Sequence, residues 1–245
     1  MEKIVIIGKC DKNAILGRYS QYAEKIEFDL PCESNEMKYA FDGVFFVGEY
    51  DKNTLLGWLG NEHQRISKDE KELEAELNFF FGIPKKVEIE RKILVEMPKE
   101  GELENLELAD YVDISQAYVK KNGSNFRVRK RGKDGDFIYI KTQKTDISAI
   151  ERTETEERIS EEEYLDCIKG FKLLSKRRWL IINGGKCFEL DIFPFWNDKA
   201  LLEIELKNAD EEFEIPPFLK VIGEVTFDRN YRNSCIAQKY GVMTD

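Results

Sequence analysis

The stretch VEIERKILV, residues 87–95, decides how most of the 245-residue sequence is interpreted. Charged and apolar side chains alternate along it, and successive side chains of a β-strand point to opposite faces of the sheet. Glu88, Glu90 and Lys92 are therefore expected on one face, with mainly apolar residues on the other. The stretch predicts a strand that has one apolar face and one charged face.

The same two-residue period recurs in the strands that we predict along the rest of the chain. Eight strands are expected, joined by glycine-rich connections that favour antiparallel hairpins: 87–95, 111–119, 124–131, 136–143, 150–158, 175–182, 186–194 and 199–207. Their charged faces carry Arg127 and Arg129, Tyr139 and Lys141, Arg152, Glu154, Glu156 and Arg158, Lys176 and Arg178, Glu189 and Asp191, and Glu203 and Glu205. On any one strand this is an ordinary solvent-exposed face. Across so many strands the pattern favours closure into a barrel with the charges inside.

A barrel interior lined with charges is stable only if the charges are paired or bind a ligand. Paired carboxylates present hard oxygen ligands that suit Mg²⁺ or Mn²⁺. Arginine and lysine suit phosphate oxygens, arginine through its planar fork of donors. Acids and bases that alternate inside one barrel therefore predict a site for a metal-bound chain of phosphates.

These motifs together resemble the CYTH domain, the family of the triphosphate tunnel metalloenzymes. Residues 88–92 are similar to its E-x-E-x-K motif. The later motifs follow in the family's order: R-x-R at 127–129, a strand lysine at 141, R-x-E-x-E at 152–156, K-x-R at 176–178, E-x-D at 189–191 and E-x-E at 203–205. An ordered set of this kind is far more specific than any single motif in it. The similarity covers about residues 87–240 and implies an α+β fold in which eight antiparallel strands form a barrel-like tunnel with flanking helices.

The resemblance also implies an activity, the hydrolysis of inorganic triphosphate or polyphosphate with Mg²⁺ or Mn²⁺. Hydrolysis of thiamine triphosphate, and cyclisation of ATP to cAMP by a class IV adenylate cyclase, are alternatives that the motifs do not separate. A non-catalytic regulatory module that binds polyphosphate or a nucleotide is the alternative of another class. The many carboxylates argue against it, because anion binding alone does not need them.

Carried over residue by residue, the resemblance implies three sets of site residues. The metal ligands are Glu88, Glu90, Glu154, Asp191, Glu203 and Glu205. The triphosphate is held by Lys92, Arg127, Arg129, Lys141, Arg152, Lys176 and Arg178, although Arg152 equally fits a structural ion pair between strand neighbours. Glu90, Glu156 and Lys92 are the expected catalytic residues. A second metal, or a carboxylate such as Glu156, is expected to position the attacking water.

The first part of the chain, residues 1–84, is predicted to be a small α/β domain. Strands at 3–7, 26–30 and 41–47 and helices at 52–59 and 69–81 are expected there. This part resembles the end of an ATPase-like P-loop region that precedes the CYTH domain in some bacterial proteins. Residues 8–14 lack the second glycine and the Ser or Thr of a P-loop. We therefore interpret the part as a degenerate remnant that is not expected to bind ATP.

The composition limits the partners and the compartment. There are 38 Lys and Arg against 48 Asp and Glu, a net charge of −10, which argues against nucleic-acid binding through bulk charge. No apolar run approaches the ~18 residues of a membrane span. The five scattered cysteines argue against a disulfide framework or a zinc site and favour the cytoplasm. The single histidine, His63, is expected to be structural. Assembly as a homodimer is left open.

Overall fold

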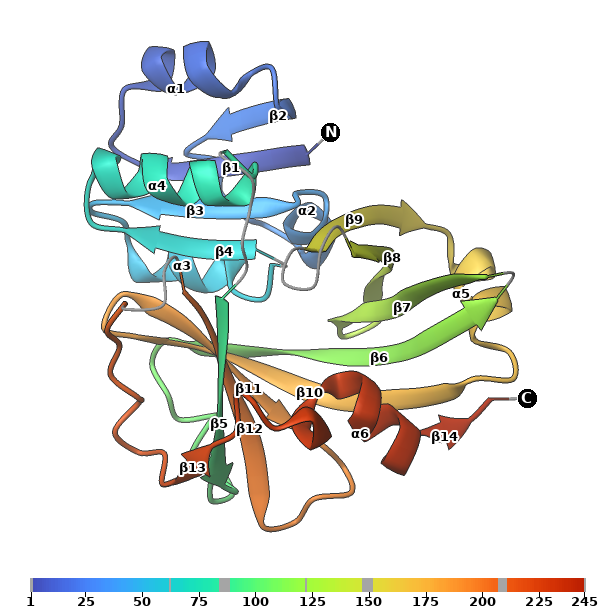
Figure 1. Ribbon diagram of the computed structural model, residues 1–245. Coiled ribbons are helices and arrows are strands. Elements are labelled where there is room, and N and C mark those ends of the chain that lie inside the picture. The colour runs from blue at the N-terminus through green and yellow to red at the C-terminus, as the bar shows by residue number, and fades with distance from the viewer. Residues whose placement is uncertain are drawn as a thin grey trace.

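The computed structural model describes residues 2–61, 63–83, 89–121, 123–146, 152–206 and 211–244, without the side chains at 89, 144–146 and 152–155. It contains two β-sheets (Figure 1). The N-terminal unit, residues 2–83, holds a four-stranded sheet, and the rest of the chain holds a ten-stranded sheet. No helix of the described segments is long and apolar enough to cross a membrane.

The sheet of the N-terminal unit is parallel and has helices on both faces. Its strands lie in the order β2-β1-β3-β4: β2 (Ala23–Phe28), β1 (Glu2–Gly8), β3 (Gly43–Val47) and β4 (His63–Ser67). The helices are α1 (Lys12–Tyr19), α2 (Asn35–Tyr39), α3 (Lys52–Trp58) and α4 (Glu70–Phe80). Each begins after a Ser or Asp side chain that accepts hydrogen bonds from first-turn amides. Alternate residues of β1 and β3 pack on α1 and α4 on one face and on α3 on the other.

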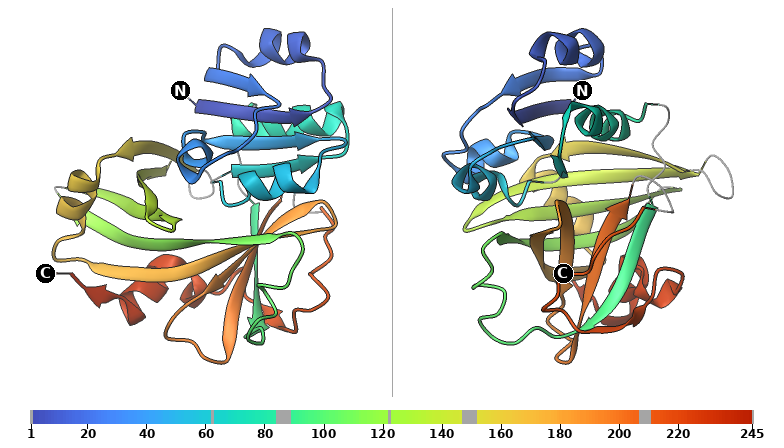
Figure 2. Two further views of the ribbon diagram at one scale, coloured as in Figure 1. Left: turned by 180° about the vertical axis from the view of Figure 1, so that it is seen from behind. Right: turned by 90° about the vertical axis from the view of Figure 1, so that its left-hand side faces the viewer.

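The large sheet is antiparallel and strongly curved (Figure 2). Its order is β13-β5-β12-β11-β10-β6-β7-β8-β9, with β14 paired to β10. The strands are β5 (Ile89–Glu96), β6 (Ala109–Lys121), β7 (Ser124–Lys133), β8 (Asp136–Asp146), β9 (Arg152–Ile159), β10 (Lys172–Asn183), β11 (Lys186–Ile192), β12 (Lys199–Leu206), β13 (Val221–Glu224) and β14 (Val242–Met243). Eight strands run from β5 to β9, as the sequence predicted. Among the described strands, however, β13 and β9 form two edges, and no ladder closes a barrel.

The outer face of the β5, β12, β11 and β10 part of the sheet is apolar and buried. Trp179, Phe188, Leu190 and Leu202 pack there beneath the segments before β6 and before β13. Phe188 has no exposed surface, and complete burial of such a side chain stabilises a fold by about 1.5–3 kcal/mol. Because the outer face holds this core, the alternate residues of the same strands point to the inner face.

Two helical segments of the second part differ from what the sequence predicts. The capping box of Ser160 and Glu163 predicts a helix over roughly 161–173, whereas α5 (Glu161–Ile168) ends five residues earlier. Gly170 there has a φ of 76°, which ends a helix, and β10 begins at Lys172. The sequence also predicts a short helix near 229–239, and the structure divides this stretch into a short 3₁₀ turn, η1 (Arg229–Tyr231), and α6 (Asn233–Tyr240).

Candidate functional site

The inner face of the large sheet gathers most of the charged residues that the sequence singled out. Directly opposed residues of antiparallel strands share a face, so the register assigns the inner face to alternate residues of each strand. Among the charged residues on it are Glu90, Lys92, Arg127, Arg129, Arg131, Glu156, Arg158, Lys176, Arg178, Glu189, Asp191, Glu203 and Glu205. Seven of these thirteen residues are basic and six acidic, so this set does not share the strongly negative balance of the whole chain.

Five of these residues form a buried acid–base cluster, defined as Lys92, Lys176, Arg178, Asp191 and Glu203. Arg178 is its centre, because its guanidinium donates to Asp191 at 2.6 and 2.7 Å and to Glu203 at 2.6 Å. Lys176 donates to Asp191, and Lys92 donates to Glu203. Each buried carboxylate therefore has two cationic partners.

The cluster lies almost entirely away from solvent, and this burial sets its pKa values. The Asp191 side chain is 0% exposed and that of Lys176 is 2% exposed. Burial, together with the charge of Arg178, lowers the pKa of Lys176. Burial alone would raise the pKa of Glu203, but Lys92, Arg178 and Lys176 lower it far below its usual range. Buried charges of this kind are tolerated only because they are paired.

Glu90 extends the cluster toward solvent. Its carboxylate lies 2.7 Å from Lys92 Nζ, and its side chain is 45% exposed. Loss of hydration, then repulsion from Glu203, raises the pKa of Glu90 to about 7, although Lys92 acts in the opposite direction. A carboxylate with such a pKa can hold or release a proton at neutral pH.

A second group of charges lies on β7, β8 and β9. Arg127 Nη2 donates to Glu156 and to Thr142, in both cases at 3.1 Å. The Thr142 hydroxyl donates to Glu156 at 2.7 Å, and Arg129 Nη2 lies 3.6 Å from the same carboxylate. Glu156 therefore organises two arginines, one of which, Arg129, is buried.

Tyr118 of β6 lies between the two groups, and sequence reasoning missed it. Burial raises the pKa of Tyr118. Its phenol also interacts electrostatically with Arg127 and Arg129 of one group and with Glu203 and Lys92 of the other. Thr142 was also missed. Neither residue belongs to a paired-charge motif. The only signal in the sequence that could have identified them is their position on the same strand face as the charged residues.

The register places Lys141 on the face of the sheet opposite to the other predicted phosphate-binding cations. Lys141 is the Cα partner of Val128, which is on the outer face, whereas Thr142 pairs with Arg127 on the inner face. The Lys141 ammonium lies 2.8 Å from Glu157 and over the Phe126 ring. The structure therefore does not bring Lys141 together with the inner-face cations. Lys144 follows Thr142 by two positions, but its side chain is outside the description.

Three further predicted residues cannot be placed, and a fourth has an unexpected partner. Glu88 and the side chains of Arg152 and Glu154 lie outside the described part. Glu205, predicted as a metal ligand, is on the inner face opposite Glu90. Its carboxylate pairs with Arg65 of β4, which lies in the N-terminal unit.

Comparison with known proteins supports the assignment that the motif order suggested. The family model of the CYTH domain matches residues 86–238. The chain belongs to the CYTH family. A search of curated proteins gave no match.

Solved structures of other proteins are similar to part of the chain. Two structures of one protein, described as a hypothetical protein and as an inorganic triphosphatase, are 28% and 27% identical to this chain. Each covers 62% of this chain and 97% or 94% of its own, with TM-scores of 0.44 and 0.43. A protein from Pyrococcus horikoshii OT3 is 22% identical over 49% of this chain and 80% of its own, with a TM-score of 0.33. Because these TM-scores are low, the family assignment rests on the match over 86–238.

CYTH enzymes generally depend on a divalent cation, but the described carboxylates are not grouped for one. No three His, Cys, Asp or Glu side chains in the described part are arranged to hold a metal ion. Asp191, Glu203 and Glu205 are instead occupied by lysines and arginines. The described residues as placed therefore do not fit the expected cation site, and no step is assigned to a metal.

In the N-terminal segment that the sequence suggested to be a P-loop remnant, side-chain carboxylates accept hydrogen bonds from backbone amides at and before the start of α1. The Asp11 carboxylate accepts hydrogen bonds from the amides of Asn13 and Ala14, and the amide of Gly8 donates to Asp29. A phosphate would thus meet carboxylates where a P-loop offers amides. His63 packs the edge of its ring on Phe80, 5.4 Å between centroids, which agrees with a structural role.

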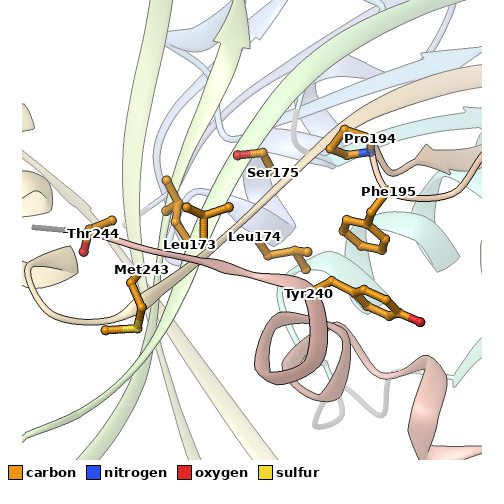
Figure 3. A pocket seen from close by; sticks show the side chains of 9 residues that line it. Leu173, Leu174, Ser175, Pro194, Phe195, Tyr240, Met243 and Thr244 are labelled. Atoms are coloured by element: carbon orange, nitrogen blue, oxygen red, sulfur yellow. The ribbon is translucent and has the colours of Figure 1, made fainter.

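A separate pocket lies between β10, α6 and β14 (Figure 3). It has a volume of about 130 Å³ and is lined mainly by apolar side chains, among them Leu173, Pro194, Phe195 and Val242. Apolar side chains offer a phosphate chain neither hydrogen bonds nor positive charge. The inner face, and not this pocket, is the candidate functional site.

Proposed function

We propose that this chain hydrolyses linear triphosphate or polyphosphate on the inner face of its large sheet. The observation that carries the proposal is the set of buried cations: Lys176 is 2% exposed, Arg178 is 10% exposed, and Arg129 lies across the face from them. Burying several cations is costly unless anions neutralise them. A triphosphate offers many oxygens to such a set, and the CYTH family match supports this ligand class.

The cations would act by replacing one anionic partner with another. In the structure Arg178 binds the carboxylates of Asp191 and Glu203. Phosphate oxygens accept the same planar fork of donors, so a bound chain would take over some of these hydrogen bonds. Charge that develops on the phosphate oxygens during the reaction would be stabilised by the same donors.

Hydrolysis needs a group that takes a proton from water, and Glu90 suits that task. The water oxygen forms a bond to phosphorus, the bridging P–O bond breaks, and a water proton goes to the base. A base works best when its pKa is near the working pH, and the pKa of Glu90 is raised to about 7. Lys92, 2.7 Å from Glu90, keeps that carboxylate oriented.

Phosphate release from inorganic triphosphate tests the proposal. Glu90→Ala is expected to abolish release while the protein stays folded. Glu157→Ala is the matched control, because Glu157 is an exposed carboxylate on the outer face of the sheet. Each protein is assayed with Mg²⁺, with Mn²⁺ and with a chelator, and phosphate, pyrophosphate and cAMP are measured with triphosphate or ATP.

Undiminished release by Glu90→Ala would exclude Glu90 as the base. Binding of triphosphate without turnover in either metal would favour a non-catalytic module. Production of cAMP from ATP would identify a cyclase instead. Each of these outcomes would change the proposed reaction, and not the proposal that the inner face binds the phosphate chain.

A further inference from the structure

Strand β6 lies between two strands that carry cations on the inner face. Lys176 and Arg178 belong to β10, and Arg127 and Arg129 belong to β7. The order β10-β6-β7 and a spacing of about 4.8 Å between neighbouring strands separate β10 from β7 by roughly 10 Å. A ligand that is held by both sets of cations must therefore cross β6.

The acids that neutralise these cations lie on strands farther from β6. Arg178 donates to Asp191 of β11 at 2.6 and 2.7 Å, and β11 is the strand beyond β10. Arg127 donates to Glu156 of β9 at 3.1 Å, and β9 is the second strand beyond β7. The carboxylates of both pairs are thus kept toward the flanks of the inner face, and β6 between them presents other side chains.

Gln116 and Tyr118 are two uncharged polar side chains on the inner face of β6. In the register Gln116 is the partner of Arg129, and Tyr118 is the partner of Arg127. Gln116 is 1% exposed and donates from Nε2 to the phenol oxygen of Tyr118 at 3.0 Å. A phenol can also donate, and no atom of the described segments accepts the proton of Tyr118. This proton is therefore available to a ligand that crosses β6.

The ring of Tyr118 is held in place by apolar packing. It packs against a buried cluster that includes Leu94 and Leu174. These two residues lie two positions from Lys92 and Lys176, respectively, on the same face of their strands. Burial raises the pKa of Tyr118, so the phenol stays protonated at neutral pH. Tyr118 is therefore a fixed and neutral hydrogen-bond donor between the two sets of cations.

We propose that Tyr118 donates a hydrogen bond to the middle phosphate of a triphosphate that spans the cations of β10 and β7, and that Gln116 orients the phenol. This inference rests on the proposed function, because it concerns a contact in the same site. The terminal phosphates carry more negative charge than the middle one, so they suit the cations, whereas a neutral donor suits the middle phosphate. Inorganic phosphate is small enough to be held by one set of cations and does not need this contact.

Tyr118→Phe tests the contact, because it removes only the hydroxyl and keeps the ring that packs in the apolar cluster. We expect the KM for triphosphate to rise about tenfold or more, the effect of one lost hydrogen bond to a charged group. The kcat should change little, because the middle phosphate keeps this contact before and during the reaction. Tyr139→Phe is the matched control, because Tyr139 lies on the outer face of β8 and bonds to Glu161. An unchanged KM in folded Tyr118→Phe would overturn the proposal.

Direct binding separates this contact from a general structural role of the hydroxyl. Calorimetry is carried out in Mg²⁺ with imidotriphosphate, whose nitrogen bridges resist hydrolysis, and with inorganic phosphate. Tyr118→Phe should weaken the binding of imidotriphosphate by the same factor of about ten and leave the binding of phosphate unchanged. An equal loss for both ligands would show that the hydroxyl supports the site as a whole and would refute its assignment to the middle phosphate.

Gln116→Leu tests the orienting role, because it removes the amide that donates to the phenol. The KM for triphosphate should rise less than in Tyr118→Phe, since the phenol keeps its proton. A larger rise would overturn the assignment of the two roles.

Failure of this inference and failure of the proposed function give different results. If wild type binds imidotriphosphate but does not turn over triphosphate, the proposed hydrolysis is refuted, and the calorimetry still decides whether Tyr118 contacts the ligand. If wild type turns over triphosphate and Tyr118→Phe behaves like Tyr139→Phe, the contact is refuted and the proposed hydrolysis stands.

Discussion

Arg178→Ala is the most informative single substitution, because Arg178 joins three carboxylates. It donates to Asp191, Glu203 and Glu189. Its removal leaves Asp191, 0% exposed, with Lys176 as its remaining partner in the cluster, and Glu203, 3% exposed, with Lys92. Breaking a buried ion pair by removing one partner costs about 3–5 kcal/mol. We expect a loss of this size in the free energy of unfolding at pH 7.

Arg177→Ala is the matched control on the same strand. Arg177 binds Asp113 through two hydrogen bonds, of 2.8 and 3.0 Å, but both side chains are 46% exposed. Exposed ion pairs contribute about 0–1 kcal/mol. The two variants remove the same kind of side chain from adjacent positions. The difference between their losses in the free energy of unfolding therefore measures the effect of burying the ion pair.

The assay is urea unfolding followed by tryptophan fluorescence, repeated from pH 7 to pH 3. The cations beside Glu203 lower its pKa far below the ordinary value of 4.5, so its stabilising contribution is complete above that value and is lost as the pH falls from there toward the folded-state pKa. The gap between wild type and Arg178→Ala should therefore stay constant from pH 7 to about pH 5 and narrow below about pH 4.5. A loss below about 1 kcal/mol at pH 7, no greater than for Arg177→Ala, would refute the reasoning, because it is the value of an exposed pair.

Three further predictions follow from the same geometry. In urea unfolding, Glu90→Gln should be more stable than wild type at pH 8 and equally stable below pH ~4.5. The reason is that the raised pKa of Glu90 makes its ionisation unfavourable in the folded protein. A difference in unfolding free energy that does not change with pH would contradict this. Arg127→Ala should raise the KM for triphosphate about tenfold or more, because a charge-assisted hydrogen bond to the substrate is lost. Lys141→Ala, on the outer face, should leave the KM unchanged. Equal effects of the two substitutions would contradict the assignment of these residues to opposite faces. The fragment 86–245 should melt at a lower temperature and scatter more light than the full chain, since Ile114 and its neighbours lose the cover of Leu59; an unchanged melting temperature would show that this contact is dispensable.

The strand period predicted which residues share a face in most of the large sheet. Lys176 and Arg178 lie on one face, opposite Trp179, as the alternation required. Such an assignment succeeds where one face is apolar and charged residues recur on the other. Whether these residues bind phosphate or metal remains a prediction.

The same period could not assign the face in β8. Its residues 138–142 read Ile-Tyr-Ile-Lys-Thr, so each face receives both apolar and polar side chains. Both faces are in fact covered, since Tyr139 packs against Tyr164 of α5 on the outside while Ile140 is 4% exposed on the inside. A strand that is buried on both faces has no clear alternation of polar and apolar residues, and for this reason the sequence could not predict the face on which Lys141 lies.

The limits of a family match need not be the limits of a site. The match begins at residue 86, where the sequence pattern changes to antiparallel strands. Arg65 precedes it and pairs with Glu205, 140 positions away along the chain. No local period can report a contact of that separation, because it depends on how two sheets dock and not on the order of residues within one strand. The motifs therefore predict only part of the inner face, because Leu59 and Arg65, which also contact it, belong to a part of the chain that the motifs do not include.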